Sequence, residues 1–290
     1  MIVLEVLFLA VFWSWACSAL LFLRNTVLPR SPITASPEHL HLPSRAIQFQ
    51  ATDGVLLEGW LIPREAEKPW IILCHGVGSN RADLLDIAAG LHRAGFNLLL
   101  FDFRGHGGSE GRTTSFGWRE QRDLEGALVF LGRQEEVPEQ PFGIYGISMG
   151  GAVALMVAAK DERIAAMAVD SPYASLEETL SQHLALLYPW LPKVPFLWFV
   201  LSTYRLRFGV WPGVVSPERS VTQLNGRPLL LIQGAQDLRM PLAGAKRLID
   251  GASGPKEFWV VEDAGHLEAF SLDPKAYLKR LVGFFRTHLS

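Results

Sequence analysis

Two kinds of hydrophobic pattern divide the chain from residue 45 onward. Residues 46–50 alternate apolar and polar side chains, and the turn Thr52-Asp53-Gly54 separates them from a second run at 55–62. This pattern predicts an antiparallel hairpin. Six later apolar runs are short, continuous and bounded by Gly, Pro or Asp, which is typical of strands buried on both faces. They lie at residues 70–74, 96–101, 142–145, 165–169, 228–232 and 258–261.

Segments with helical spacing separate these runs. They cover residues 81–93, 117–131, 150–160, 176–187, 243–249 and 275–288. Repeated alternation of strand and helix predicts an α/β domain with a mostly parallel sheet of about eight strands and helices on both faces. We place this domain at residues 45–290.

One stretch, residues 184–215, interrupts the alternation. It is rich in aromatic side chains and is broken by Pro189, Pro192 and Pro195. Its longest unbroken apolar part is too short to cross a membrane. We interpret the stretch as a lid inserted between two strands, and a pair of core helices is the alternative.

The first 23 residues are apolar, with Glu5 as their one charged side chain. At about 1.5 Å per residue such a helix is long enough to cross roughly 30 Å of hydrocarbon. The run therefore predicts a single membrane anchor, followed by a linker at residues 24–44. Arg24, Arg30 and Arg45 would favour a cytoplasmic catalytic domain. An uncleaved helix packed on the domain and a cleaved signal peptide are the alternatives.

Composition narrows the class of protein. The chain has 290 residues, 49% hydrophobic and 19% charged, with a formal net charge of −2. These values exclude a mainly disordered chain, and they argue against a nucleic-acid partner. Two cysteines, Cys17 and Cys74, provide no disulfide framework and no CxxC metal pattern.

The strongest chemical signal is Gly146-Ile147-Ser148-Met149-Gly150, which follows the predicted strand at 142–145 and opens a predicted helix. This is the context of a G-x-S-x-G nucleophile elbow. Small residues are needed there because the turn is tight. We therefore predict that Ser148 is a nucleophile, against the alternative of a glycine-rich turn with an uninvolved serine.

A serine of ordinary pKa needs a base, and the base needs an orienting carboxylate. His266 follows the predicted strand at 258–261, whereas His183 lies in a helix and His288 at the chain end. Asp237 follows the strand at 228–232, and Asp170 is the competing carboxylate. Loops at the carboxyl edge of a parallel sheet carry ligand-binding and catalytic groups. The order Ser148, Asp237, His266 therefore predicts a catalytic triad.

The oxyanion of an acyl-transfer intermediate needs two donors. We predict the backbone N–H groups of Met149 and of Val77, which follows Gly76 in the loop after residues 70–74. His75 is interpreted as structural. The glycine-rich segment 102–111 lacks the spacing of phosphate-binding and dinucleotide-binding loops, so a tight structural loop is expected there, with Asp102 and Arg104 bonded to nearby backbone.

Taken together, these motifs resemble the α/β-hydrolase superfamily over residues 45–288. The resemblance rests on His75-Gly76, residues 102–111, residues 146–151, Asp170-Ser171-Pro172, residues 234–237 and Gly265-His266. Within the superfamily, the chain looks similar to the membrane-anchored serine hydrolases. This resemblance implies hydrolysis of an ester or thioester through an acyl-enzyme. The triad chemistry itself requires no metal or organic cofactor.

An apolar acyl group is expected from the aromatic lid and the predicted anchor. Acyl-protein thioesterase and serine peptidase activities use the same triad and remain alternatives, as does a membrane-tethered binding module without catalysis. Epoxide hydrolase and dehalogenase activities are disfavoured, because those relatives carry Asp where this chain has Ser148.

Overall fold

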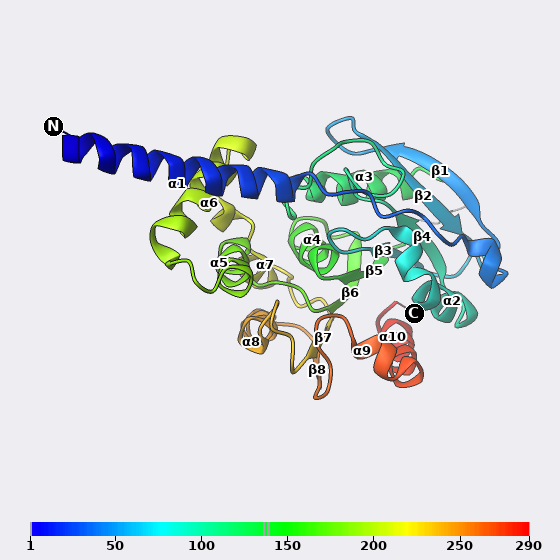
Figure 1. The fold of residues 1–290 in the computed structure, drawn as a ribbon. Helices are drawn as coiled ribbons and strands as arrows, with labels where there is room; N and C mark the ends of the chain where they lie inside the picture. Colours follow the sequence, from blue (N-terminus) through cyan, green and yellow to red (C-terminus); the bar gives the residue numbers. More distant parts are fainter. Residues whose placement is uncertain (1, 136, 138–139, 290) are drawn as a thin grey trace.

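A single sheet organises the part of the chain that the computed structural model describes, residues 2–135, 137 and 140–289. Its eight strands lie in the order β1-β2-β4-β3-β5-β6-β7-β8 (Figure 1). Their bounds are β1 Arg45–Gln50, β2 Leu56–Ile62, β3 Trp70–Cys74, β4 Asn97–Phe101, β5 Phe142–Ile147, β6 Ile164–Asp170, β7 Leu229–Gly234 and β8 Lys256–Val261. Strand β2 pairs antiparallel with β1 and β4, and the remaining pairs are parallel. The predicted hairpin and mostly parallel sheet are confirmed.

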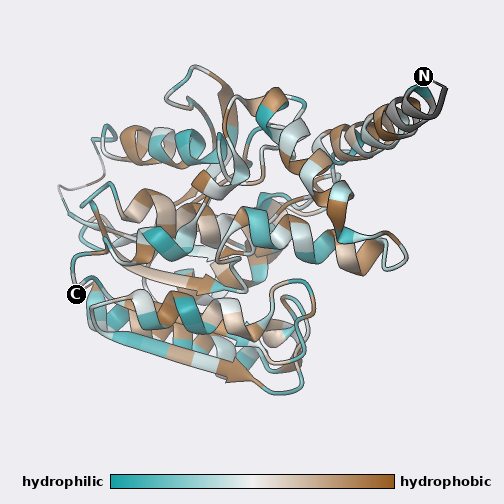
Figure 2. Ribbon diagram, turned by 90° about the vertical axis from the view of Figure 1, so that its left-hand side faces the viewer, coloured by the Kyte–Doolittle hydropathy of each residue, from teal (hydrophilic) through white to brown (hydrophobic). Residues whose placement is uncertain are grey.

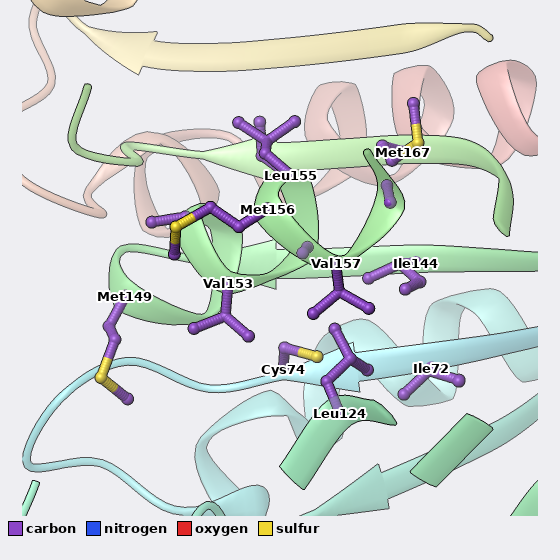
Figure 3. Close-up of a cluster of buried hydrophobic side chains, with 14 of the residues drawn as sticks. Ile72, Cys74, Leu124, Ile144, Met149, Val153, Leu155, Met156, Val157 and Met167 are labelled. Carbon is purple, nitrogen blue, oxygen red and sulfur yellow. The ribbon is translucent and has the colours of Figure 1, made fainter. Parts of the chain in front are cut away.

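Helices cover both faces of the sheet, as the continuous apolar runs predict. Helices α3 (Glu120–Leu131), α4 (Met149–Ala158) and α8 (Leu242–Gly251) pack on one face, and α2 (Leu85–Arg93), α9 (Ala269–Leu272) and α10 (Pro274–His288) pack on the other. Successive side chains of a strand point to opposite faces. In β3, Ile72 and Cys74 therefore lie in the core under α4 (Figure 3), while Ile71 and Leu73 lie in the core under α2 and α10. Each fully buried side chain of this size contributes about 1.5–3 kcal/mol to folding.

The first turn of the helix predicted at 81–93 is a 3₁₀ turn, η2 (Arg81–Leu84), which leads into α2. Asn80 caps it by accepting the N–H of Ala82 at 2.9 Å. The buried carboxylate of Asp102 accepts the N–H of Arg81 at 2.7 Å and its guanidinium at 2.6 Å. These contacts from a neighbouring loop hold the chain in the tighter turn.

The segment between β6 and β7 forms a helical layer over one end of the sheet. It contains α5 (Leu176–Leu187), α6 (Lys193–Phe208), the 3₁₀ turn η3 (Pro212–Val214) and α7 (Pro217–Val221). The stretch predicted as a lid, residues 184–215, holds the end of α5, all of α6 and η3. Tyr204 and Phe208 are buried, whereas Trp190 and Trp198 are 75% and 60% exposed. The layer is therefore anchored at the C-terminal end of α6 and exposed near its N-terminal end.

The N-terminal helix α1 (Ile2–Thr26) runs along α6, and its first turns extend beyond the body of the protein (Figures 1 and 2). Ala19, Phe22 and Thr26 in its C-terminal half are buried against the domain. The linker that follows α1 contains a short 3₁₀ helix, η1 (Pro37–Leu40).

The predicted membrane anchor at residues 1–23 is not supported. Among the residues that the structure describes, which omit Met1 and the side chains of 2–4, 6–8 and 10, no helix is both long and apolar enough to cross a bilayer. The assignment of a cytoplasm-facing domain, which depended on that anchor, is likewise unsupported. In the second half of α1, Ala19 and Phe22 are buried against the domain, whereas Leu20 is exposed.

Candidate active site

Ser148 lies at the junction between β5 and α4, where the backbone takes an unusual conformation. Its φ is 50° and its ψ is −118°, a combination that is uncommon for a residue with a side chain. Two glycines allow this turn. A Cβ on Gly146 would lie 2.6 Å from the carbonyl oxygen of Gly150, and a Cβ on Gly150 would lie 2.2 Å from that of Cys74. The spacing of the elbow motif thus has a direct steric cause.

His266 reaches Ser148 from the loop that follows β8. Its Nε2 lies 3.1 Å from Ser148 Oγ, and its Nδ1 lies 2.7 Å from Asp237 Oδ2. An ionised carboxylate only accepts hydrogen bonds, so Nδ1 carries a proton and Nε2 is the nitrogen that can accept the serine proton. The three side chains form one continuous hydrogen-bonded chain.

Asp237 follows β7 and is buried, and its carboxylate is held on both oxygens. Oδ1 accepts the backbone N–H of Arg239 at 2.9 Å and of Met240 at 2.8 Å, and Oδ2 accepts the amide of Gln233 at 3.2 Å besides His266. Burial opposes ionisation, but the hydrogen bonds from His266 and the two backbone donors outweigh it, so the pKa of Asp237 lies below its ordinary value. The carboxylate is therefore charged at neutral pH.

The two predicted oxyanion donors lie beside the serine. Met149 is the first residue of α4 and is buried, and Val77 follows Gly76 in the loop after β3. A Cβ on Gly76 would lie 3.4 Å from Ser148 Cβ, at van der Waals contact, so this loop runs directly beside the serine. Gly76, Val77, Ser148 and Met149 all line one cavity. The N–H groups of Val77 and Met149 remain the predicted donors.

This cavity has a volume of about 560 Å³ and is lined mainly by apolar side chains. Its floor holds Ser148 and His266, and α5 and α6 supply much of its roof. The volume lies within the range of about 300–1,000 Å³ typical of small-molecule sites. The stretch predicted as a lid therefore contributes lining residues to the cavity that contains Ser148.

The competing carboxylate, Asp170, makes its hydrogen bonds elsewhere. Its Oδ2 accepts the hydroxyl of Tyr277 at 2.8 Å, and its Oδ1 accepts that of Ser171 at 2.9 Å. Tyr277 in turn lies 2.8 Å from the hydroxyl of Tyr145. Burial raises the pKa of Asp170 to about 6, although these hydrogen bonds lower it in part. Sequence reasoning missed this buried network, because its members come from β5, β6 and α10.

The two other candidate bases, His183 and His288, make contacts with other residues. His183 lines the cavity from α5, but its Nδ1 donates to the carbonyl of Thr179 at 2.9 Å. His288 lies at the end of α10, with its ring 4.9 Å from that of Phe284. Of the three histidines, the structure thus brings His266 to Ser148.

The loops that were predicted as structural make structural contacts. The buried ring of His75 donates from Nδ1 to the carbonyl of Gly76 at 2.7 Å and accepts the N–H of Phe103 at 3.0 Å. Burial lowers the pKa of His75 to about 3, so the ring is neutral. Asp102 accepts the N–H of Gly108 at 2.8 Å, within the glycine-rich loop. Arg104 differs from the prediction, because its guanidinium binds carboxylates rather than backbone: Asp123 at 2.6 Å and Asp53 at 2.7 Å.

Sequence reasoning also missed a set of cavity residues on α1. Ser18, Leu21, Phe22 and Asn25 line the same cavity as Ser148. Their spacing of three or four residues puts them on one helix face. This periodicity is the feature of the sequence that could indicate a cavity-lining face. It is hard to recognise because the surrounding residues of the helix are also mostly apolar.

Comparisons with known proteins agree with this architecture. The family model for the alpha/beta hydrolase fold matches residues 69–210. The uncharacterized protein Rv2307c of Mycobacterium tuberculosis is 31% identical over 242 residues, which cover 83% of this chain and 78% of the relative. The uncharacterized protein YqkD of Bacillus subtilis is 30% identical over 233 residues, which cover 80% of this chain and 75% of the relative.

Solved structures extend the comparison to most of the chain. The Pyrococcus furiosus esterase Pf2001 superposes with a TM-score of 0.76 at 25% identity, covering 91% of this chain and 98% of the esterase. The alpha/beta hydrolase GrgF from Penicillium superposes with a TM-score of 0.67 at 22% identity, covering 86% of this chain and 99% of GrgF, which shows the shared fold. These matches do not show the membrane-anchored subgroup that the sequence resembles.

Proposed function

This chain belongs to the α/β-hydrolase superfamily, and on that premise we propose that it is a serine hydrolase that cleaves carboxylic esters. The observation that carries the proposal is the hydrogen-bonded chain from Asp237 through His266 to Ser148 at the floor of an apolar cavity. A serine with only a structural role would not need a histidine as a base. A binding module without catalysis would not need a buried carboxylate that orients that histidine. The esterase Pf2001, which shares the fold, adds support.

In the proposed reaction, His266 Nε2 takes the proton of Ser148 as its Oγ attacks the ester carbonyl carbon. The carbonyl π electrons move onto oxygen, and the N–H groups of Val77 and Met149 stabilise the oxyanion. Asp237 holds the ring in its tautomer and stabilises the imidazolium. When the intermediate collapses, the C–O bond to the alcohol breaks and His266 protonates that alcohol as it leaves.

Water completes the cycle. His266 removes a proton from the water, the hydroxide attacks the acyl-enzyme, and the Ser148–acyl bond breaks as Oγ regains a proton from the imidazolium. The products are one carboxylic acid and one alcohol, so no oxidant, metal or organic cofactor is needed for the balance. The apolar lining of the cavity favours esters with an apolar acyl group.

The test is hydrolysis of p-nitrophenyl butyrate by the full chain and by Ser148→Ala. We expect kcat to fall on the order of 10⁶-fold, as for other triads that lose their nucleophile. Ser220→Ala is the matched control, because Ser220 lies on α7 and its hydroxyl donates to the carbonyl of Ser216, just before that helix, at 3.2 Å. Equal activity of wild type and Ser148→Ala would overturn the proposal. Parallel assays with a thioester and an anilide of the same acyl group distinguish esterase from thioesterase and peptidase.

A further inference from the structure

The C-terminal half of α1 forms one wall of the cavity above Ser148. Ser18, Leu21, Phe22 and Asn25 occupy positions i, i+3, i+4 and i+7, so they share one face of the helix, and all four line the cavity. Leu28, just beyond the helix, continues this wall. A segment that looks like an anchor in the sequence is thus part of the site.

Contacts along its length hold this wall in place. The ring of Phe22 lies 6.3 Å from that of Phe116 and 6.1 Å from that of Tyr204 on α6. The buried carbonyl of Thr26 accepts the N–H of Thr114 at 2.9 Å. Farther on, the guanidinium of Arg30 donates to the carbonyl oxygens of Gly107 at 2.6 Å and Gly111 at 2.8 Å. Helix α1 is therefore docked on the loops around the site.

The wall presents little polarity to the cavity. Ser18 donates its hydroxyl to the carbonyl of Ser14 at 2.8 Å, and Asn25 donates one amide N–H to that of Leu21 at 2.9 Å, so each polar side chain spends a donor on its own helix. Across the cavity, α5 contributes Leu180, Leu184 and Leu187. The part of the cavity between these side chains of α1 and α5, called the slot below, thus has an apolar lining.

We propose that this slot binds the acyl chain of the substrate, and that the α1 face of Ser18, Leu21, Phe22 and Asn25 determines the preference for medium- and long-chain acyl esters. The inference rests on the proposed esterase function for its substrate class. The whole cavity of 560 Å³ equals the volume of roughly 19 water molecules at about 30 Å³ each. A methylene is close to a water in size, so the cavity as a whole has room for an acyl chain of about a dozen carbons together with its ester group.

The test uses two neighbouring leucines of α1. Leu21 lines the slot, whereas Leu20 is 71% exposed. Leu21→Glu puts a carboxylate beside the acyl chain, and Leu20→Glu is the matched control with the same charge on the same helix. Leu21 is itself 42% exposed, so its carboxylate can reach water in the free protein and the fold is preserved.

For wild type and Leu20→Glu, we expect kcat/KM of p-nitrophenyl esters to rise from acetate towards laurate by up to about fourfold per methylene. In Leu21→Glu, the ratio of kcat/KM for laurate to that for acetate falls at least tenfold. Equal ratios in the two glutamate variants would overturn the inference. Far-ultraviolet circular dichroism confirms that each variant is folded.

A binding measurement that does not depend on hydrolysis distinguishes failure of this inference from failure of the proposed function. The probe is dodecanoate, titrated calorimetrically into wild type and both glutamate variants. Weaker binding by tenfold or more in Leu21→Glu alone supports the slot, even if no ester is hydrolysed and the esterase proposal fails. Unchanged binding in Leu21→Glu, or absence of binding to wild type, overturns the slot, even if Ser148-dependent hydrolysis of short esters is observed.

Discussion

Replacing Asp237 with Asn tests the arrangement of the proposed triad most directly. The carboxylate Oδ1 accepts two backbone N–H groups, from Arg239 and Met240, and Oδ2 accepts Nδ1–H of His266. An amide has one acceptor oxygen, so in Asp237→Asn either the backbone donors or His266 must face the NH₂ group. Turning NH₂ towards the backbone would leave two donors unpaired, at about 1–3 kcal/mol each. We therefore expect the oxygen to stay with the backbone and the NH₂ to face His266.

In that orientation Nδ1 of His266 must accept a hydrogen bond, so the proton moves to Nε2. The nitrogen that lies 3.1 Å from Ser148 Oγ then cannot accept the serine proton. The equivalent substitution in serine proteases lowers kcat about 10⁴-fold, which corresponds to about 5.4 kcal/mol of transition-state stabilisation at 1.36 kcal/mol per factor of ten. We expect a loss of this size for Asp237→Asn with little change in thermal stability.

The assay is kcat/KM for p-nitrophenyl butyrate, with Asp170→Asn as the control. Asp170 is a buried carboxylate at the end of the adjacent strand β6, but its hydrogen bonds go to Tyr277 and Ser171. The control is expected to stay within a few-fold of wild type. Activity of Asp237→Asn within tenfold of wild type would refute the tautomer argument. An equal loss in Asp170→Asn would show that the two carboxylates act together.

Two further predictions concern stability. Gly150→Ala would bring a Cβ to 2.2 Å from the backbone carbonyl oxygen at the end of β3, so we expect a loss of about 3 kcal/mol or more in the free energy of unfolding by urea. Gly283→Ala on α10 has no atom within 4 Å of the new Cβ, and a gain of about 0.5–1 kcal/mol is expected there; equal effects would contradict the steric account. The pKa of Asp170 is raised from 3.8 to about 6 by burial, so between these values the unfolded chain releases a proton that the folded protein keeps, and stability falls as pH rises through this window. Relative to Asp170→Asn, wild type should lose about 2 kcal/mol between pH 4 and 7 in urea titrations, and parallel curves would count against a raised pKa.

Local sequence was sufficient to predict much of the architecture. Continuous apolar runs predicted the central strands, because a strand buried on both faces has no polar side. The elbow around Ser148 was also visible locally, since the positive φ and the close approach of β3 require small residues on either side. Asp237 and His266 could be selected because the carboxyl ends of parallel strands meet at one edge of the sheet.

The choice between carboxylates depended on tertiary structure. Asp170 ends β6 and Asp237 follows the adjacent strand β7, so their positions relative to the strands do not determine which one faces His266. Tyr277 of α10 occupies one oxygen of Asp170, whereas backbone donors in the turn after β7 orient Asp237 towards the histidine.

The environment of the N-terminal helix α1 also depends on contacts that the local sequence does not reveal. Hydropathy is a property of single residues, so an apolar run has the same hydropathy whether it faces lipid or protein. The apolar run at residues 1–23 therefore predicts an anchor. Contacts of Phe22 with Phe116 and Tyr204, about 90 and 180 positions away, bury the second half of the helix against the domain. The sequence by itself determined that this segment is helical and apolar, and only the tertiary contacts decided that one of its faces lines the cavity over Ser148.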